Sequence, residues 1–181
     1  MMGTNPLTFS LPTDEEFPFC LDCATSTVQR GKIEYYARSG KDTPAGMVIS
    51  ENGDTLTDSE QILKDLVAGT AALAPLGGVG EEMAGYKGYG YAAVVEILSA
   101  ALAGGNFMKA LTGVSEDGKP QMYGLGHFFF VVDPEAFVGL ESFKKTAGDI
   151  CRALRASKKA PGCDRIYTAG EKEYLTWLDR K

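Results

Sequence analysis

Short apolar runs that resemble β-strands alternate with longer helix-like segments along this chain, and this alternation limits the possible folds more than any other feature. Residues 5–11 (NPLTFSL) and 17–24 (FPFCLDCA) are apolar runs bounded by proline, threonine and acidic residues, which is typical of strands. Residues 126–133 (GHFFFVVD) form a continuous apolar run, as expected of a strand covered on both faces. Helix-like segments separate these runs, so the sequence predicts the α/β class.

Capping patterns mark the helices of the first half. Residues 24–41 (ATSTVQRGKIEYYARSGK) begin with serine and threonine, which are favoured at helix N-caps, and a stop signal follows at residues 39–40. Asp58 and Gln61 stand three residues apart in a capping-box pattern, which predicts a helix over residues 58–69. Between these helices, residues 42–58 predict a loop or hairpin with a turn at ENGD.

The second half predicts three further helices. The first runs from about residue 89 to 102 and stops at the glycine pair 104–105. The second carries one apolar stripe at helical spacing. Its members are Phe143, Ala147, Ile150, Cys151 and Leu154. The third follows Thr168 and Glu171, which stand in capping-box register near the C-terminus.

The stretch AGYKGYGYAAVVEILSAAL, residues 84–102, sets three glycines and a lysine in front of an apolar helix-like run. Free N–H groups at a helix N-terminus, with a lysine beside them, can hold an anionic ligand. The same residues also suit a flexible entrance to a core helix. The order of the glycines is the reverse of the Rossmann fingerprint. The overlapping segment GEEMAGYK is not a P-loop, because no lysine directly follows its second glycine and no serine or threonine comes next.

Composition excludes several functional classes. A formal charge of −6 and a pI near 4.9 argue against nucleic acid as the main ligand. The most apolar run, residues 91–104, is too short to span a membrane and contains Glu96. The N-terminal MMGTNPLTFS has neither a basic nor an apolar signal region, so we expect a soluble, cytoplasmic protein.

Metal or dithiol chemistry is a weak hypothesis for the four cysteines. Cys20 and Cys23 match C-x-x-C, but they lie on a predicted buried strand, where residues three apart point to opposite faces. Cys151 and Cys163 are not closely spaced, and His127 is the only histidine. We therefore predict small buried thiols in a reducing compartment, and no metal site.

Three places could hold a ligand. Asp22 ends a strand just before the helix entry ATST, which puts a carboxylate near free N–H groups; an ordinary strand-to-helix turn explains the pattern as well. Arg30 could pair with a substrate carboxylate or lie on a solvated helix face. The segment RIYTAGE, residues 165–171, repeats a basic residue before a capped helix, with the same two interpretations.

Six segments occur in a characteristic order along the whole chain. They are MGTNPLTFSLP, LDCATSTVQRGKIEYYARSGK, PLGG, GYKGYG, GHFFFVVDPEAF and RIYTAGE. Together they resemble the malate/L-lactate dehydrogenase family, which includes sulfolactate dehydrogenase, ureidoglycolate dehydrogenase and Δ1-piperideine-2-carboxylate reductase. The long GGVGEEMAGYKGYGY loop is similar to the branch labelled malate dehydrogenase. The resemblance implies an NAD(P)-dependent oxidoreductase with a non-Rossmann α/β fold, a mixed β-sheet flanked by helices, that acts as a homodimer.

The resemblance also assigns roles to residues. The positions that match the family's substrate contacts are Thr4, Arg30 and Gly31. The positions that match its cofactor contacts are Asp22, Cys23, Ala24, Lys87, Arg165, Ile166, Tyr167, Thr168, Ala169 and Gly170. On these grounds the glycine-rich stretch is expected to bind cofactor as well as open a helix. The resemblance does not decide whether the cofactor is NAD or NADP. It also does not decide whether the substrate is malate, lactate, sulfolactate or a cyclic imine.

Two departures from the family pattern bear on catalysis. Family members are roughly twice as long, and their Ser-His pair, whose histidine transfers the proton, is absent from this chain. Lys32 stands where some relatives carry a carboxylate. The resemblance therefore implies that residues 1–181 are a single cofactor-binding α/β domain lacking an upstream N-terminal half, and catalytically inactive alone. The chain could be a proteolytic fragment, an incomplete gene product or one of two assembling polypeptides; the rival hypothesis is a catalytically silent binding module.

Overall fold

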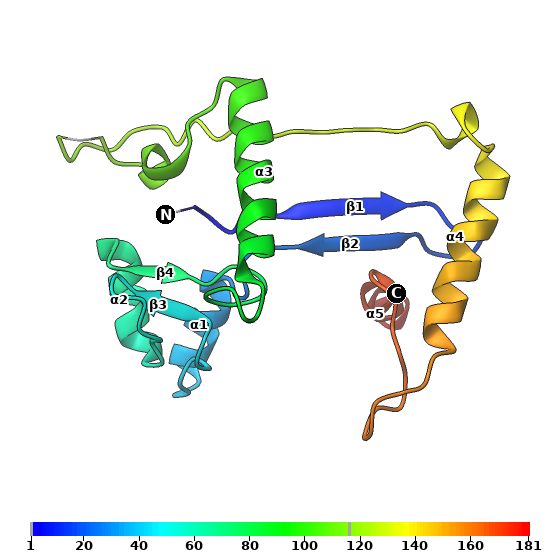
Figure 1. Cartoon of the computed structure of the whole chain (residues 1–181), viewed down its shortest axis with the longest axis horizontal. Coiled ribbons are helices and arrows are strands. Elements are labelled where there is room, and N and C mark those ends of the chain that lie inside the picture. The colour runs from blue at the N-terminus through cyan, green and yellow to red at the C-terminus, as the bar shows by residue number, and fades with distance from the viewer. Residues whose placement is uncertain (1, 116) are drawn as a thin grey trace. The chain divides into compact units, whose positions relative to one another are not determined.

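The structure, a computed structural model, describes residues 2–115 and 117–181 and divides the chain into two compact units. Residues 2–6 and 24–129 form the first unit, and residues 7–23 and 130–181 form the second. Each unit has its own strands and helices (Figure 1). The expectation that residues 1–181 act as one cofactor-binding domain stays a prediction.

The core of the first unit lies between a small hairpin and two helices. Strands β3 (Val48–Ser50) and β4 (Ala71–Leu73) pair antiparallel, and helices α1 (Arg30–Arg38) and α2 (Ser59–Ala68) lie beside them (Figure 1). The buried apolar residues that meet here are Val28, Ile33, Val48, Ile62 and Ala71. A short 3₁₀ helix, η1 (Met108–Thr112), follows later in the same unit.

Helix caps follow the sequence at α2 but not at α1. Asp58 accepts a hydrogen bond from the Gln61 backbone N–H at 2.9 Å, as the capping pattern predicts. The expected serine or threonine cap of α1 is wrong, because Gln29 precedes that helix and no side chain caps it. The Thr25 hydroxyl instead donates to the Asn5 carbonyl of the N-terminal segment, and the Ser26 hydroxyl donates to the Val28 carbonyl.

Helix α3 (Gly85–Ala103) starts four residues earlier than the predicted start at residue 89, so the glycine-rich stretch is its first turn. A Cβ atom at Gly88 would lie 2.3 Å from the Leu76 carbonyl oxygen, and one at Gly85 would lie 2.0 Å from that of Gly78. No real side chain tolerates such distances. Glycine at these two positions therefore lets α3 lie directly against the backbone of residues 76–78.

The second unit is built on an antiparallel ribbon of β1 (Leu7–Leu11) and β2 (Phe19–Cys23), which confirms both predicted strands. Helices α4 (Leu140–Arg155) and α5 (Glu171–Arg180) hold the connection between these strands (Figure 1). Arg152 of α4 binds Asp14 through both guanidinium nitrogens, at 2.9 and 3.1 Å. The rings of Phe17 and Tyr174 of α5 stack with centroids 4.9 Å apart. A short 3₁₀ helix, η2 (Pro134–Ala136), precedes α4.

The predicted strand over residues 126–133 is wrong. These residues belong to no strand of the described structure, and Phe129 and Val131 are 87% and 89% exposed. A covered strand needs neighbours that pair with its backbone and pack on its faces, and the described residues supply neither. The apolar stripe of α4 is likewise only partly covered: Cys151 is buried, whereas Ile150 and Leu154 are about half exposed.

The four cysteines differ in how deeply they are buried. All four are free thiols, and Cys151 is buried as predicted. Cys20 and Cys23 are half-buried on β2, and Cys163 is exposed, so the prediction of four buried thiols is wrong. The ribbon alone covers little of its own surface, because a two-stranded sheet has no second layer. Burial raises the pKa of the Cys151 thiol, which makes it a poor nucleophile.

Helices α1 to α5 are each too short or insufficiently apolar to cross a membrane, within the part of the chain that the structure describes.

Replacing Gly88 or Gly90 with alanine tests the packing of α3. Gly88→Ala should destabilise the protein by about 1–3 kcal/mol, because the new methyl group meets the Leu76 backbone. Gly90→Ala should stabilise it by up to about 1 kcal/mol, because alanine favours helix and no described atom lies within 4 Å of the added carbon. Urea unfolding of both variants measures the difference. Equal stabilities would contradict the packing of α3 on residues 76–78.

Candidate functional site

A hollow of about 230 Å³ in the first unit brings together three of the motifs singled out in the sequence. Its wall includes Gly3 of MGTNP, Thr25 and Ser26 of ATST, and Tyr89 of GYKGYGY. Ala72 and Leu73 of β4, and Pro75 after it, contribute to the same wall. Segments far apart in the sequence therefore meet at one place.

Backbone contacts hold the N-terminal segment at this hollow. The Thr25 N–H donates to the Thr4 carbonyl at 2.9 Å, and the Thr25 hydroxyl donates to the Asn5 carbonyl at 2.9 Å. The Asn5 side chain in turn donates to the Ala92 carbonyl of α3 at 2.9 Å and to the Glu96 carboxylate at 2.8 Å. Asn5 has a positive φ of 39°, a conformation that asparagine tolerates better than most residues. Asn5 therefore ties the strand-to-helix turn to α3.

The described wall of the hollow carries no charge, and its hydroxyl groups already have hydrogen-bond partners within the protein. None of its described lining residues is charged, and the hydroxyls of Thr25 and Ser26 already donate to carbonyl groups of the protein. Its volume is below the roughly 300 Å³ that usually marks a complete ligand pocket. Such a hollow suits one uncharged portion of a larger ligand.

Two of the predicted cofactor stretches meet in the second unit. The Cys20 N–H of β2 donates to the Ala169 carbonyl at 3.0 Å, which ties residues 165–170 to the strand that carries Asp22 and Cys23. Gly170 has a φ of 87° and lies so close that a Cβ there would be 3.0 Å from the Cβ of Cys20. Asp22 is exposed on the ribbon and accepts a 2.7 Å hydrogen bond from the Thr8 hydroxyl opposite it. Its carboxylate is thus placed to accept further hydrogen bonds from solvent or ligand.

A buried charge network fixes the shape of residues 165–170. Glu171, only 1% exposed, forms an ion pair with Arg165 and accepts from the Thr168 N–H at 3.0 Å and the Thr168 hydroxyl at 3.2 Å. Arg155 of α4 lies 3.6 Å from the same carboxylate and donates to the Thr168 hydroxyl at 3.1 Å. Arg155 also forms an ion pair with Glu15. One half of the predicted capping box is therefore present, although Gly170 rather than Thr168 is the N-cap of α5.

Opposing effects set the pKa of Glu171. Burial raises it, but the hydrogen bonds from Thr168 and the charges of Arg165 and Arg155 outweigh burial, so the net pKa lies below its ordinary value. A carboxylate with a lowered pKa stabilises the folded state above its ordinary pKa of about 4.3, and that stabilisation is lost as the pH falls through the lowered value.

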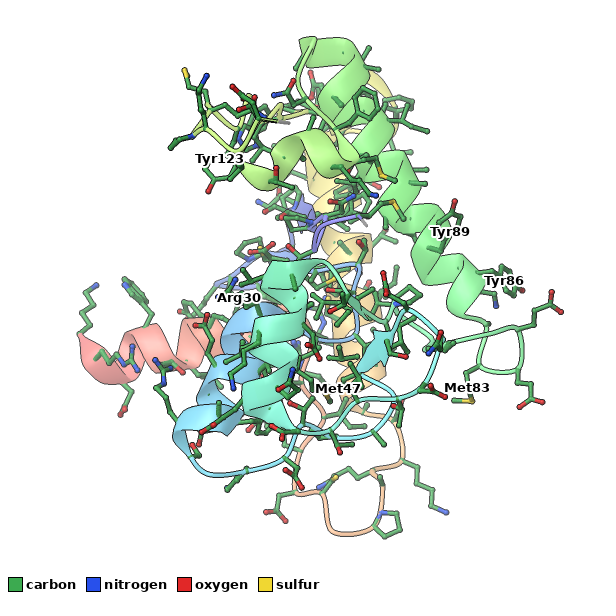
Figure 2. The ribbon with its side chains drawn as sticks, turned by 90° about the vertical axis from the view of Figure 1, so that its left-hand side faces the viewer. Arg30, Met47, Met83, Tyr86, Tyr89 and Tyr123 are labelled. Atoms are coloured by element: carbon green, nitrogen blue, oxygen red, sulfur yellow. The ribbon has the colours of Figure 1, made fainter. Side chains whose placement is uncertain are left out.

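The remaining predicted residues lie outside these two places. Arg30 opens α1 and pairs with Glu34 at 3.0 Å on a largely exposed face, and no described atom lies within 4 Å of a Cβ built at Gly31. Lys87 is exposed in the first turn of α3, with its ammonium 5.9 Å from the centre of the Tyr86 ring. Figure 2 labels Arg30 on α1 and Tyr86 and Tyr89 on α3. The structure brings Tyr89 to the wall of the hollow but none of Arg30, Gly31 and Lys87.

The sequence interpretation missed several residues that build the two places. Thr25 and Ser26 were taken as helix caps, and Tyr89 as an ordinary helical residue. Arg155 and Glu15 carried no motif at all. From the sequence, Arg155 is an ordinary helical residue and Glu15 an ordinary loop residue. Only the tertiary contacts show that Arg155 binds Thr168 and that Glu15 pairs with Arg155. Among residues 2–115 and 117–181, the structure contains no group of three or more acidic, histidine or cysteine side chains that could hold a metal ion.

Comparison with known proteins places the chain in a family. Over residues 1–181 the sequence matches the family described as malate/L-lactate dehydrogenase. The chain belongs to this family. It is 42% identical to malate dehydrogenase of Pyrococcus horikoshii over 180 residues, which cover 99% of this chain and 47% of that protein. It is 28% identical to malate/(S)-sulfolactate dehydrogenase of Methanothermus fervidus over 159 residues, which cover 88% of this chain and 42% of the relative.

Solved structures agree with the sequence relationship. The crystal structure of malate dehydrogenase from Entamoeba histolytica superposes with a TM-score of 0.89 at 42% identity, covering 97% of this chain and 48% of that one. Sulfolactate dehydrogenase from Methanocaldococcus jannaschii superposes with a TM-score of 0.75 at 29% identity, covering 99% and 47%. The expected α/β fold of the sulfolactate dehydrogenase type is thereby confirmed. The chain spans about half the length of the relatives that it matches.

Removing the charge of Glu171 tests the network. Glu171→Gln should lower the free energy of unfolding by about 1–3 kcal/mol at pH 7, because Arg165 and Arg155 lose a charged acceptor. The loss should shrink as the pH falls below the ordinary pKa of about 4.3, and it should vanish only below the lowered pKa of the folded state, where the wild-type carboxylate is protonated too. Urea unfolding between pH 3 and 7 measures it, with Glu173→Gln, an exposed acid of the same helix, as the control. A loss that is independent of pH would contradict the electrostatic account.

Proposed function

We propose that this chain supplies the cofactor-binding half of an NAD(P)-dependent oxidoreductase that interconverts malate and oxaloacetate in the cytoplasm. Membership of a family of malate and sulfolactate dehydrogenases supports the reaction class. A nicotinamide cofactor, when bound, would supply the hydride acceptor for the hydroxyl-bearing carbon, and a base would have to take the hydroxyl proton. The complete enzyme is a homodimer in which a missing N-terminal segment adds the proton-transferring residue.

The observation that carries this proposal is that the N-terminus of α3 has no side-chain cap and has a lysine in its first turn. Ala84 precedes the helix in a left-handed conformation, and no side chain caps the first turn. That turn contains Lys87 and no acidic residue. The N-terminus of a 19-residue helix with an adjacent ammonium group favours a phosphate, which a dinucleotide supplies. The α5 N-terminus is a poorer phosphate site, because Glu171 and Glu173 already place carboxylates in its first turn.

The other predicted residues, each within its own unit, offer groups of the kinds that bind a dinucleotide or a hydroxy acid. Asp22 offers an exposed carboxylate that can accept from ribose hydroxyls, and residues 165–170 lie against the same strand. Cys23 and Ala24 directly precede Thr25 in the sequence, and the uncharged hollow that Thr25 lines suits a ring or ribose portion. Thr4, Arg30 and Gly31 are assigned to substrate, with the Arg30 guanidinium available to a substrate carboxylate if it exchanges its pairing with Glu34.

The proton-transfer step falls outside this chain. His127 is the only histidine, and it is exposed beside Phe129 with ring centres 6.4 Å apart. We assign it no catalytic role. Because a positioned general acid or base contributes about a hundred- to ten-thousandfold to the rate, the chain by itself is inactive.

Lys87→Ala tests the phosphate contact. The substitution should weaken binding of NADH or NADPH to the purified chain by about ten- to a hundredfold, because one charge-assisted contact is lost. Fluorescence titration measures the affinity, and thermal melting verifies that the variant is folded. Lys64→Ala removes an exposed lysine from α2 and should leave the affinity unchanged. Equal affinities of wild type and Lys87→Ala would remove α3 from the cofactor site.

A further inference from the structure

One side of α3 is apolar and uncovered. We call Tyr91, Val94, Ile97, Ala101 and Leu102 the outer face of α3, since they are spaced to lie on one side of the helix and all are exposed. Ile97 is 62% and Leu102 67% exposed. From residue 88 to 103 the helix has a single charged residue, Glu96. The outer face therefore offers solvent an apolar surface without a charge.

The opposite side of α3 packs against other residues of the first unit. Gly85, Gly88, Ala92 and Ala100 are buried there. Glu96 points to this side as well, where it accepts from the Asn5 side chain at 2.8 Å and from the Met108 N–H at 2.7 Å. A helix that is apolar on every side normally lies in a protein interior. The contacts of the first unit cover only one side of this one.

A hollow extends the outer face toward the C-terminal end of α3. It has a volume of about 450 Å³, and Ile97, Ala101 and Phe107 form part of its wall. Glu96 is the charged residue of that wall, and its carboxylate already accepts from Asn5 and the Met108 N–H. Phe107 is itself 60% exposed. Exposed apolar patches of this kind, with room for an inserted side chain, mark surfaces at which another polypeptide binds.

We propose that the outer face of α3 docks the polypeptide corresponding to the half of these enzymes that lies outside the match. This rests on the proposed function, in which a second segment completes the enzyme. The relatives carry about as much unmatched chain as matched chain, since the match covers 47% of the Pyrococcus horikoshii protein and 48% of the Entamoeba histolytica one. The docking segment presents apolar side chains to Val94 and Ile97 and no unpaired charge, because α3 has no partner for one there.

A second copy of the chain fits this surface less well. A two-fold contact buries the same patch on both copies. The second unit has uncovered apolar residues of its own, including Phe9 on β1 and Ile150 and Leu154 on α4. These residues belong to a different unit from α3, so the self-complementary patch on α3 does not include them. A segment as long as this chain is large enough to cover apolar surface on both units.

Co-expression of the two polypeptides tests the proposal. The probe is the part of Pyrococcus horikoshii malate dehydrogenase outside the match, co-expressed with this tagged chain; its own matched half, tagged in the same way, is the positive control. After affinity purification we expect equal amounts of the two polypeptides, and a mass by light scattering of two copies of each if the complex forms the proposed homodimer. Ile97→Glu should reduce the co-purified probe at least tenfold, because a charge enters the apolar contact. Val67→Glu, at a 72% exposed position of α2, should leave it unchanged. Circular dichroism verifies the fold of both variants.

Three results would overturn the proposal. The first is a complex that Ile97→Glu leaves intact, and the second is no complex where the positive control forms one. The third is self-association of the wild-type chain alone that Ile97→Glu abolishes, which would make a second copy the occupant. Association is measured without cofactor or substrate, so its failure differs from failure of the proposed function. Loss of NADH binding with an intact complex would overturn only the function.

Discussion

Direct backbone contact between α3 and residues 76–78 is the constraint on which the first unit depends. It exists because positions 85 and 88 are glycine, where any Cβ would collide with a carbonyl oxygen. The contact fixes the rotation of α3 about its axis. That rotation brings Tyr89 and Ala92 to the hollow beside residues 2–3, exposes Lys87, and turns Ile97 and Leu102 outward. The glycine-rich stretch is thus a packing motif, and the ligand site proposed at its N-terminus follows from the same geometry.

In the second unit, a buried ion-pair network rather than a backbone contact fixes the conformation of the candidate binding segment. A two-stranded ribbon covers little surface, so the segment before α5 depends on Glu171 and its two arginines for a defined conformation. A buried charge of this kind is costly unless its partners are complete. Here Thr168 and both guanidinium groups satisfy it. The result is a preorganised segment beside Asp22 at a place where the unit has little hydrophobic core.

Local features of the fold could be predicted from the sequence, and long-range ones could not. Short apolar runs bounded by proline, threonine and acidic residues identified both strands of the ribbon, and Asp58 identified the start of α2. The start of α3 was missed because glycine disfavours helix locally, and only the approach of residues 76–78 explains its presence. The strand predicted over residues 126–133 failed because pairing needs partners that the described chain does not place there. The hollow depends on Gly3, Thr25 and Tyr89, which no local pattern connects.

The central claim is that this chain holds a nicotinamide dinucleotide but cannot transfer the substrate proton. Its most direct test is to measure dinucleotide binding and turnover on one purified sample, with malate and lactate as substrates and NAD⁺ and NADP⁺ as acceptors. The account predicts saturable binding of NADH or NADPH and no reduction of either acceptor above background. Turnover that co-purifies with the chain would contradict it and make His127 a candidate base. Absence of any binding by folded protein would contradict it in the other direction and favour a catalytically silent module.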